Sequence, residues 1–210
     1  MFFIIFFHIL VDILLCYHKR ISMALFSKNC LGIDIGASSV KIVEVSNGGK
    51  KKKLENYIEF KMPLTEKSLK TFHGDNMALL SNNVVEILQA LLKRAKIKSK
   101  KVALSLPDFS TFFTTFALPP MTEAEVPQAI EFEARHYIPL PLNEVTFDWQ
   151  IIEKEETVSG LKRKVLLVAI PNVVLQNYQK VASLCNLEVI GMEAEVFSLV
   201  RSAWPGEKYE

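Results

Sequence analysis

The stretch Leu31-Gly32-Ile33-Asp34-Ile35-Gly36-Ala37-Ser38-Ser39-Val40-Lys41-Ile42-Val43-Glu44-Val45 organises the rest of this chain. Apolar residues alternate up to Ile35, and branched apolar residues resume at Val40, so the stretch predicts two strands joined by a tight turn. Gly36 stands where the chain must reverse. A residue without a Cβ can turn tightly there and lets backbone N–H groups approach a ligand.

The chemistry of this stretch lies in its turn. Asp34 ends the first strand with a carboxylate, a hard oxygen ligand that suits Mg²⁺ or a water bound to it. Lys41 can place an ammonium group against phosphate oxygens. The small turn residues can point their N–H groups inward as an anion-binding nest; they are Gly36, Ala37, Ser38 and Ser39. These groups predict half of a nucleotide site, although a plain β-hairpin with a surface aspartate stays open because short glycine motifs are weak evidence.

The residues from Gly32 to Glu44 resemble the first phosphate hairpin of the actin-like ATPase superfamily. A second stretch, Leu118-Pro119-Pro120-Met121 followed by Ile130 to Leu142, is similar to the pattern of the PilM family of type IV pilus assembly proteins. In that family Leu-Pro-x-Met precedes Glu-Ala and Tyr-Ile-Pro. Residues 165–171 and 193–201 also fit, so the resemblance extends from Met23 to about Trp204.

The resemblance implies an α/β (α+β) fold, namely half of an actin-like ATPase (ribonuclease H-like) fold with a small inserted α+β subdomain. It implies ATP and Mg²⁺ as cofactors, with Asp34 holding the metal through water. The nucleotide-binding residues that it implies are Asp34, Gly36, Ala37, Ser38, Ser39 and Lys41. No stretch supplies catalytic residues, so we expect a scaffold with weak ATPase activity at most.

The resemblance also implies partners and a location. The N-terminal cytoplasmic peptide of the inner-membrane protein PilN would bind in a groove between the inserted subdomain and its host, as an extended peptide. The protein would then join the inner-membrane pilus assembly complex, support twitching motility and act on the motor ATPases indirectly. It would be cytoplasmic and peripheral at the inner face of the cell membrane.

Two other classes of protein in this superfamily have a similar hairpin. An FtsA-like cell-division protein has a similar inserted subdomain but would need a C-terminal amphipathic membrane helix, and the sequence contains none. A sugar or acetate kinase of the same superfamily would need a catalytic base and a sugar pocket, which no stretch offers.

Composition narrows the class of protein further. The chain has 210 residues, half of them apolar, so it can bury a core as one domain or two small ones. Its net charge of +2 does not favour nucleic acid or an anionic membrane as the main partner. Cys16, Cys30 and Cys185 are widely spaced, which argues against a disulfide framework or a zinc site and fits a reducing cytosol.

Residues 1–22 differ from the rest in being mostly apolar. They could form a short membrane anchor or a buried helix, but we favour upstream sequence included by a wrong start codon, because Met23 resembles the start of a PilM-type chain. We expect residues 23–62 and 187–210 to form an incomplete actin-like subdomain, and 63–186 an inserted α+β subdomain with its connecting helix. A second phosphate hairpin should follow the last helix in this superfamily, so we expect this chain to be a truncated, N-terminal half.

The hydrophobic periodicity predicts the remaining elements. The helices are expected at residues 77–95, 122–138, 172–185 and 194–203, and the further strands at 54–62, 101–106, 112–118, 144–153, 164–170 and 187–191. Thr122 and Glu125 form a capping box. Pro127 fits badly so soon after that box and should kink the first turns or delay the start of the helix.

Overall fold

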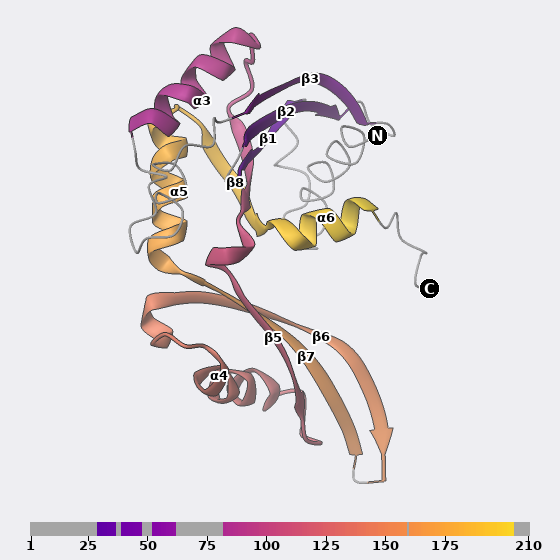
Figure 1. The fold of residues 1–210 in the computed structure, drawn as a ribbon. Coiled ribbons are helices and arrows are strands. Elements are labelled where there is room, and N and C mark those ends of the chain that lie inside the picture. Colours follow the sequence, from indigo (N-terminus) through magenta and orange to yellow (C-terminus); the bar gives the residue numbers. More distant parts are fainter. Residues whose placement is uncertain (1–28, 37–38, 48–51, 62–81, 159, 204–210) are drawn as a thin grey trace. The chain divides into compact units, whose positions relative to one another are not determined.

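The computed structural model describes residues 29–36, 39–47, 52–61, 82–158 and 160–203 (Figure 1). The apolar extension 1–22, the turn residues Ala37 and Ser38, and the expected turn at 48–51 lie outside these ranges. The chain divides into two compact units, one made of residues 1–108 and 177–210 and the other of residues 109–176. The second unit is therefore inserted into the first along the sequence.

The first unit is built on a five-stranded sheet with the strand order β3-β2-β1-β4-β8. The strands β1 (Asn29–Ile35), β2 (Ser39–Asn47) and β3 (Lys52–Lys61) form the antiparallel part. The strands β4 (Lys101–Leu106) and β8 (Glu188–Ala194) run parallel to β1. The predicted hairpin is thus confirmed, and β1 is buried along almost its whole length between β2 and β4.

The helix α3 (Asn82–Arg94) belongs to the first unit, and the C-terminal end of α5 (Asn172–Leu184) meets it (Figure 1). The amide of Gln89 donates to the carbonyl of Leu184 at 2.9 Å and joins them. Leu88 and Leu91 of α3 are buried, at the spacing that the inner face of an amphipathic helix requires. The boundary between the units falls within α5, after Gln176, so this helix belongs to both.

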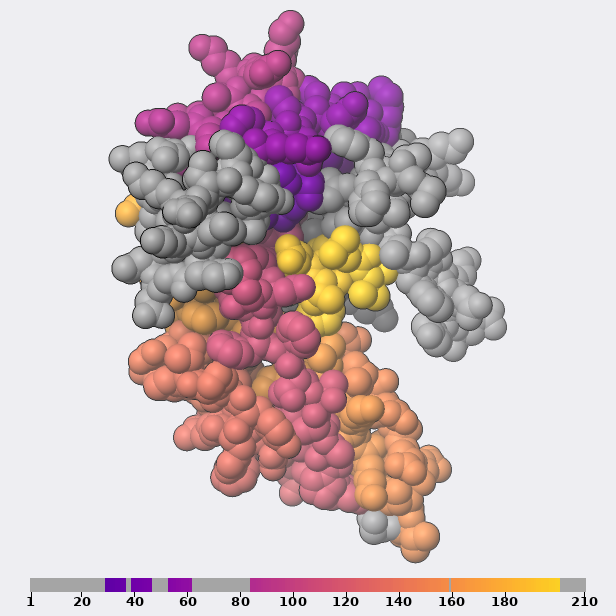
Figure 2. Space-filling model, viewed as in Figure 1, coloured from indigo at the N-terminus to yellow at the C-terminus, as the bar shows by residue number. Residues whose placement is uncertain are grey.

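The last helix, α6 (Glu195–Ala203), follows β8 directly. Figure 2 shows it in yellow at the surface of the first unit. Leu199 and Val200 on this helix are exposed, whereas Ser198 is fully buried and donates to the carboxylate of Glu193 at 3.0 Å. The buried hydroxyl is thereby satisfied.

The second unit is a three-stranded antiparallel sheet with one helix packed on it. Its strands, in the order β5-β7-β6, are β5 (Phe112–Leu118), β7 (Gly160–Pro171) and β6 (Val145–Thr157). The helix α4 (Val126–Tyr137) buries Val126, Ile130 and Ala134 against this sheet. Two short 3₁₀ turns complete the chain order, at Asp108–Ser110 and Leu142–Glu144.

The inserted unit, residues 109–176, is shorter than the range of 63–186 that we predicted for it. The strand Lys101–Leu106 pairs with β1 and β8, so it extends the first sheet and does not join Phe112–Leu118. Sequence alone cannot separate two neighbouring apolar strands that enter different sheets, because both have the same alternation. The helix expected at 122–138 begins at Val126, with Pro127 in its first turn, and its N-cap is Glu125, which makes no side-chain capping bond. The predicted capping box is therefore only half formed. The N–H and the hydroxyl of Thr122 both donate to the carboxylate of Glu125, whereas the N–H of Glu125 donates to the carbonyl of Thr122 and not to its hydroxyl.

The turn between β6 and β7 depends on a glycine. Gly160 has a φ of +119°, a backbone conformation that residues with a Cβ rarely adopt. A Cβ added at this position would lie 3.0 Å from the Cβ of Pro120, so the turn approaches the Pro119-Pro120 segment closely.

We expect Gly160→Ala to lower the free energy of unfolding by about 1–3 kcal/mol, because alanine is strained at this φ. Gly191→Ala in β8 is the matched control, since a Cβ there meets nothing within 4 Å. The control should be neutral or stabilise by roughly 0.5–1 kcal/mol. Urea unfolding of both variants measures the difference, and equal stability of the two would contradict this role of Gly160.

Candidate functional site

The register of the first hairpin places Asp34 directly opposite Lys41. Residues opposite each other in an antiparallel pair point to the same face of the sheet. The ammonium nitrogen of Lys41 lies 3.3 Å from Oδ2 of Asp34 and forms an ion pair with it. The structure therefore brings together the carboxylate and the cation that the sequence singled out.

Asp34 is only 8% exposed. Burial raises the pKa of its carboxyl group, and the charge of Lys41 and hydrogen bonds from Lys41 and Ser105 oppose that rise. Ser105 stands beside Asp34 in the parallel pairing of β1 with β4. Burial thus disfavours the charged form of Asp34, and the side chains of Lys41 and Ser105 partly compensate for that effect.

The turn after β1 is closed by the N–H of Gly36, which donates to the carbonyl of Ser39 at 2.9 Å. A Cβ on Gly36 would lie 3.4 Å from that carbonyl oxygen and 3.9 Å from Oδ2 of Asp34. Glycine therefore keeps the space beside the carboxylate open. Ser39 is buried at the start of β2, whereas Ala37 and Ser38 lie outside the described residues.

Sequence reasoning missed a second carboxylate near Asp34. Glu195 begins α6, and its pKa is raised by burial and by the negative charges of Asp34 and Asp108, whereas Lys41 lowers it. Asp108 follows β4 and accepts a hydrogen bond from the N–H of Val196 at 3.2 Å, which caps the start of α6. The Glu-Ala-Glu of the last stretch was visible in the sequence, but nothing in it indicated that β8 would join the same sheet as β1, next to β4.

Tyr178 of α5, on the helix that the sequence predicted at residues 172–185, lies in the core. The side chain is 1% exposed, but its hydroxyl has no hydrogen-bond partner within the described part of the protein. Burial and the charges of Asp34 and Glu195 raise the pKa of this phenol. The structure therefore buries this hydroxyl without a hydrogen-bond partner among the described residues.

These groups fit a hydrated Mg²⁺ with a phosphate group. Carboxylates and hydroxyls are hard oxygen donors, and Mg²⁺ commonly keeps several waters and takes only one or two protein carboxylates. No cluster of three or more histidine, cysteine, aspartate or glutamate side chains in the described ranges is arranged to hold a metal directly. The donor set therefore suits a cation held through water, with Lys41 placed for phosphate oxygens.

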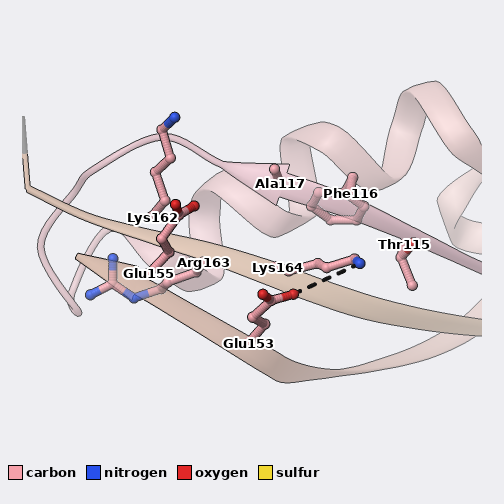
Figure 3. A pocket seen from close by; sticks show the side chains of 8 residues that line it. All are labelled: Thr115, Phe116, Ala117, Glu153, Glu155, Lys162, Arg163 and Lys164. Atoms are coloured by element: carbon pink, nitrogen blue, oxygen red, sulfur yellow. Dashed lines mark ion pairs between the residues drawn. The ribbon is translucent and has the colours of Figure 1, made fainter. Parts of the chain in front are cut away.

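The second unit holds a hollow of about 270 Å³ on its sheet (Figure 3). Its charged lining residues are Glu153, Glu155, Lys162, Arg163 and Lys164. Glu153 forms an ion pair with Lys164 at 3.8 Å, with both side chains about half exposed or more. Opposite charges on a solvated sheet surface pair with each other, so the charged lining of this hollow does not indicate a particular ligand.

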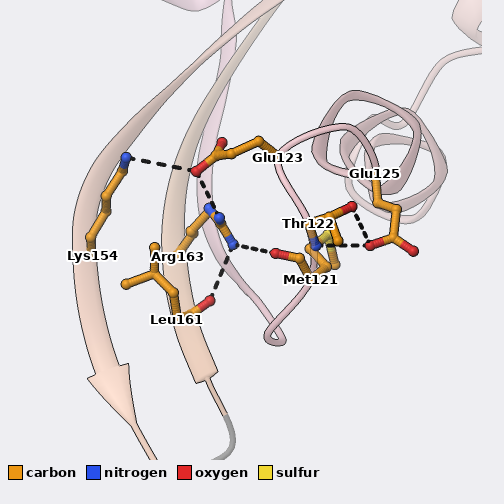
Figure 4. Close-up of polar contacts among 7 residues, drawn as sticks. All are labelled: Met121, Thr122, Glu123, Glu125, Lys154, Leu161 and Arg163. Atoms are coloured by element: carbon orange, nitrogen blue, oxygen red, sulfur yellow. Dashed lines mark hydrogen bonds and ion pairs between the residues drawn. The ribbon is translucent and has the colours of Figure 1, made fainter.

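Arg163 explains why the Leu-Pro-Pro-Met stretch lies where it does (Figure 4). Its buried guanidinium donates to the carbonyls of Met121 and Leu161 and to the carboxylate of Glu123. These bonds hold the segment before α4 against the β6–β7 hairpin, and the bond from Arg163 lowers the pKa of Glu123. We assign Arg163 to the structure of the second unit.

A family model described as type IV pilus assembly protein PilM matches residues 32–205. The chain belongs to the PilM family. The match includes the Asp34 hairpin, the Leu-Pro-Pro-Met stretch and α6, so it confirms the resemblance that those residues suggested.

Two solved structures share the PilM-type fold. A PilM–PilN type IV pilus biogenesis complex has a TM-score of 0.64 and 23% identity, covering 82% of this chain and 48% of that one. The cytoplasmic domain of EpsL, an inner-membrane component of the type II secretion system of Vibrio cholerae, has a TM-score of 0.50 and 11% identity, covering 78% of this chain and 56% of that one. The fold is half of an actin-like ATPase fold, as predicted, and the chain spans about half the length of these relatives.

The helices in the described part of the chain are all too short or too polar to cross a membrane. The apolar segment 1–22, for which we considered a membrane anchor, lies outside that part.

We expect Asp34→Asn to raise the melting temperature at pH 7. Because the pKa of Asp34 is raised in the folded state, its contribution to stability falls as the pH rises above its ordinary value of 3.8. The melting temperatures of the variant and the parent should converge below that pH, where the carboxyl group is protonated in both states. Thermal unfolding from pH 3 to 7 measures this difference.

Glu188→Gln is the control, because Glu188 is an exposed carboxylate on the edge strand of the same sheet. It should change the melting temperature little at any pH. A lower melting temperature of Asp34→Asn at pH 7 would show that the attraction of Lys41 outweighs the burial of the carboxylate.

Proposed function

We propose that this protein is a nucleotide-binding scaffold of type IV pilus assembly, and that the Asp34 hairpin is one wall of its nucleotide site. The ion pair of Asp34 with Lys41, within a chain that belongs to the PilM family, carries the proposal. Membership of the PilM family supports a role in type IV pilus assembly. The side chains of the hairpin support a nucleotide as the ligand.

The ligand chemistry follows from the geometry of the turn. Lys41 is 34% exposed at its side chain, so its ammonium can turn from Asp34 toward phosphate oxygens. Asp34 then accepts a hydrogen bond from water bound to Mg²⁺. The turn from Gly36 to Ser39 remains the proposed anion-binding segment. The N–H of Gly36 already donates to the carbonyl of Ser39, and Ala37 and Ser38 lie outside the described residues. When bound, Mg²⁺ would neutralise phosphate charge.

The scaffold role rests on the sequence, in which no stretch supplies catalytic residues. In the described residues, no group of three or more histidine, cysteine, aspartate or glutamate side chains could hold a metal ion directly. We therefore propose nucleotide-dependent shape with weak ATPase activity at most. Closure by a second half would exclude water and supply further contacts in a longer protein.

The partner that we propose is the N-terminal cytoplasmic peptide of PilN. A PilM–PilN complex is among the similar solved structures, which supports the pairing. Binding of that peptide would hold this chain at the inner face of the cell membrane, within the inner-membrane assembly complex. Its action on the motor ATPases would be indirect.

We expect Asp34→Ala and Lys41→Met each to weaken Mg-ATP binding about tenfold or more, because each removes a charge-assisted contact. Calorimetry with Mg-ATP on the 210-residue chain measures the affinity, with Glu188→Gln as the unchanged control. Equal affinity in all variants would show that the hairpin is only structural.

A second prediction concerns the partner. A fluorescent peptide with the N-terminal cytoplasmic sequence of PilN from the same genome should bind this chain, and a scrambled peptide of the same composition should not. Fluorescence anisotropy measures both. Equal binding of the two peptides, or no binding of either, would contradict the proposed docking.

A further inference from the structure

A dense run of positive charge, which we call the basic segment, spans the end of α3 and the start of β4. Residues 93–101 contain six basic side chains and no acidic one: Lys93, Arg94, Lys96, Lys98, Lys100 and Lys101. The whole chain has a net charge of only +2, of which this segment supplies +6, so the other residues sum to −4. The charge of the protein is therefore strongly polarised, which the total conceals.

The backbone of the basic segment is fixed where it leaves α3. Lys96 has a φ of +53°, and the N–H of Ile97 donates to the carbonyl of Leu92 at 3.0 Å, which is the hydrogen bond of a Schellman helix end. The side-chain amide of Asn56 on β3 donates to the carbonyl of Ala95. The end of the helix is thus tied to the first sheet.

Beyond the helix, side chains of the basic segment alternate between the inside and the outside. Ser99 is half-buried, and its hydroxyl donates to the buried carboxylate of Glu44 on β2. Lys96, Lys98 and Lys100 are all exposed. Because alternate residues of an extended chain share one side, these three ammonium groups project from the sheet together. Figure 2 shows the end of α3, in magenta, at the surface of the first unit.

Neither the helix dipole nor ion pairing accounts for this charge. Cations in the last turn of a helix offset its dipole, which explains Lys93 and Arg94 at most. Within the described ranges, none of the six cations forms an ion pair. The cations that do are Lys41, Lys53, Arg135, Lys154, Arg163 and Lys164. Unpaired like charges so close together repel one another, so the basic segment carries a charge that reduces stability and that the fold does not use.

We propose that the basic segment is a contact surface for an anionic lipid bilayer. Clustered cations are attracted to the negative potential of such a surface, and the net charge of −4 on the other residues turns this segment toward it. The contact adds to the proposed docking of the PilN peptide and does not depend on it. A net charge of +2 for the whole chain agrees with a bilayer that is not the main partner.

The composition of the segment favours lipid over nucleic acid. Five of its six cations are lysines, which act as point charges on a fluid array of headgroups. Nucleic-acid recognition draws on the bidentate fork of arginine and on aromatic side chains that stack on bases. The segment contains one arginine and no aromatic residue.

Vesicle sedimentation tests the proposal on the 210-residue chain, without nucleotide or peptide. Vesicles of phosphatidylglycerol and phosphatidylcholine in equal amounts should bind the chain, and vesicles of phosphatidylcholine alone should bind it much less. The neutral vesicles also measure any binding through the apolar residues 1–22. Binding to the anionic vesicles should fall as the salt concentration rises from about 0.05 M to about 0.5 M, because salt screens exposed charges.

The triple variant Lys96→Gln, Lys98→Gln and Lys100→Gln should bind the anionic vesicles about thirtyfold more weakly, or worse, because each cation near such a surface strengthens binding roughly fivefold. Its melting temperature should equal or exceed that of the parent, since the variant relieves repulsion between like charges. A lower melting temperature with unchanged vesicle binding would show that the lysines serve the fold, and would overturn the proposal.

A matched control lowers the net charge by the same amount on the β6–β7 hairpin of the second unit. It replaces three lysines there by glutamine: Lys154, Lys162 and Lys164. This control should bind the anionic vesicles as the parent does. An equal loss in the two triple variants would show that only the net charge matters, and would overturn the proposal.

Two further results would also overturn it. One is equal binding of the parent to anionic and neutral vesicles. The other is tighter binding to a fluorescent DNA duplex than to anionic vesicles at the same phosphate concentration, which would assign the basic segment to nucleic acid. Failure of these tests leaves the nucleotide site and the PilN docking standing, because neither ligand is present, and failure of those two tests leaves the lipid contact standing.

Discussion

The opposition of Asp34 and Lys41 across the first hairpin is the constraint on which the candidate site depends. Their ion pair, 3.3 Å long, exists because β1 and β2 pair in one register and β4 brings Ser105 to the other side of Asp34. A slip of one residue would turn one member of the pair to the opposite face of the sheet. Burial of Leu31, Ile33 and Ile42 in the core opposes such a slip, since it would expose them.

Other elements of the first unit carry polar groups whose charges influence one another and Asp34. Asp108 follows β4, Glu195 begins α6 after β8, and Tyr178 lies on α5. Several of these groups are unfavourable for folding, because burial raises the pKa of Asp34 and of Glu195 and leaves the Tyr178 hydroxyl unsatisfied. Local features that reduce stability are typical of functional sites, where a ligand supplies the missing partners.

The sequence predicted the hairpin and most helices well, because their signals are local. Alternation located the two strands that carry Asp34 and Lys41, and the 3.6-residue period located the helices α3 and α5. It could not assign Lys101–Leu106 to the first sheet, because pairing with β1 and β8 is a long-range contact. For the same reason Glu195 and Ser105 were missed, since nothing near them in the sequence indicates Asp34 as a neighbour.

One experiment tests the central claim most directly, namely that the Asp34 hairpin holds a metal–nucleotide complex. Amide resonances of the ¹⁵N-labelled chain would be followed by NMR during addition of substoichiometric Mn-ATP, whose unpaired electrons broaden nearby signals. We predict broadening at Gly36 and Ser39 of the turn, at Ser105 and at Glu195, with the β6–β7 hairpin unaffected. Broadening that is uniform, or centred on the second unit, would contradict the account.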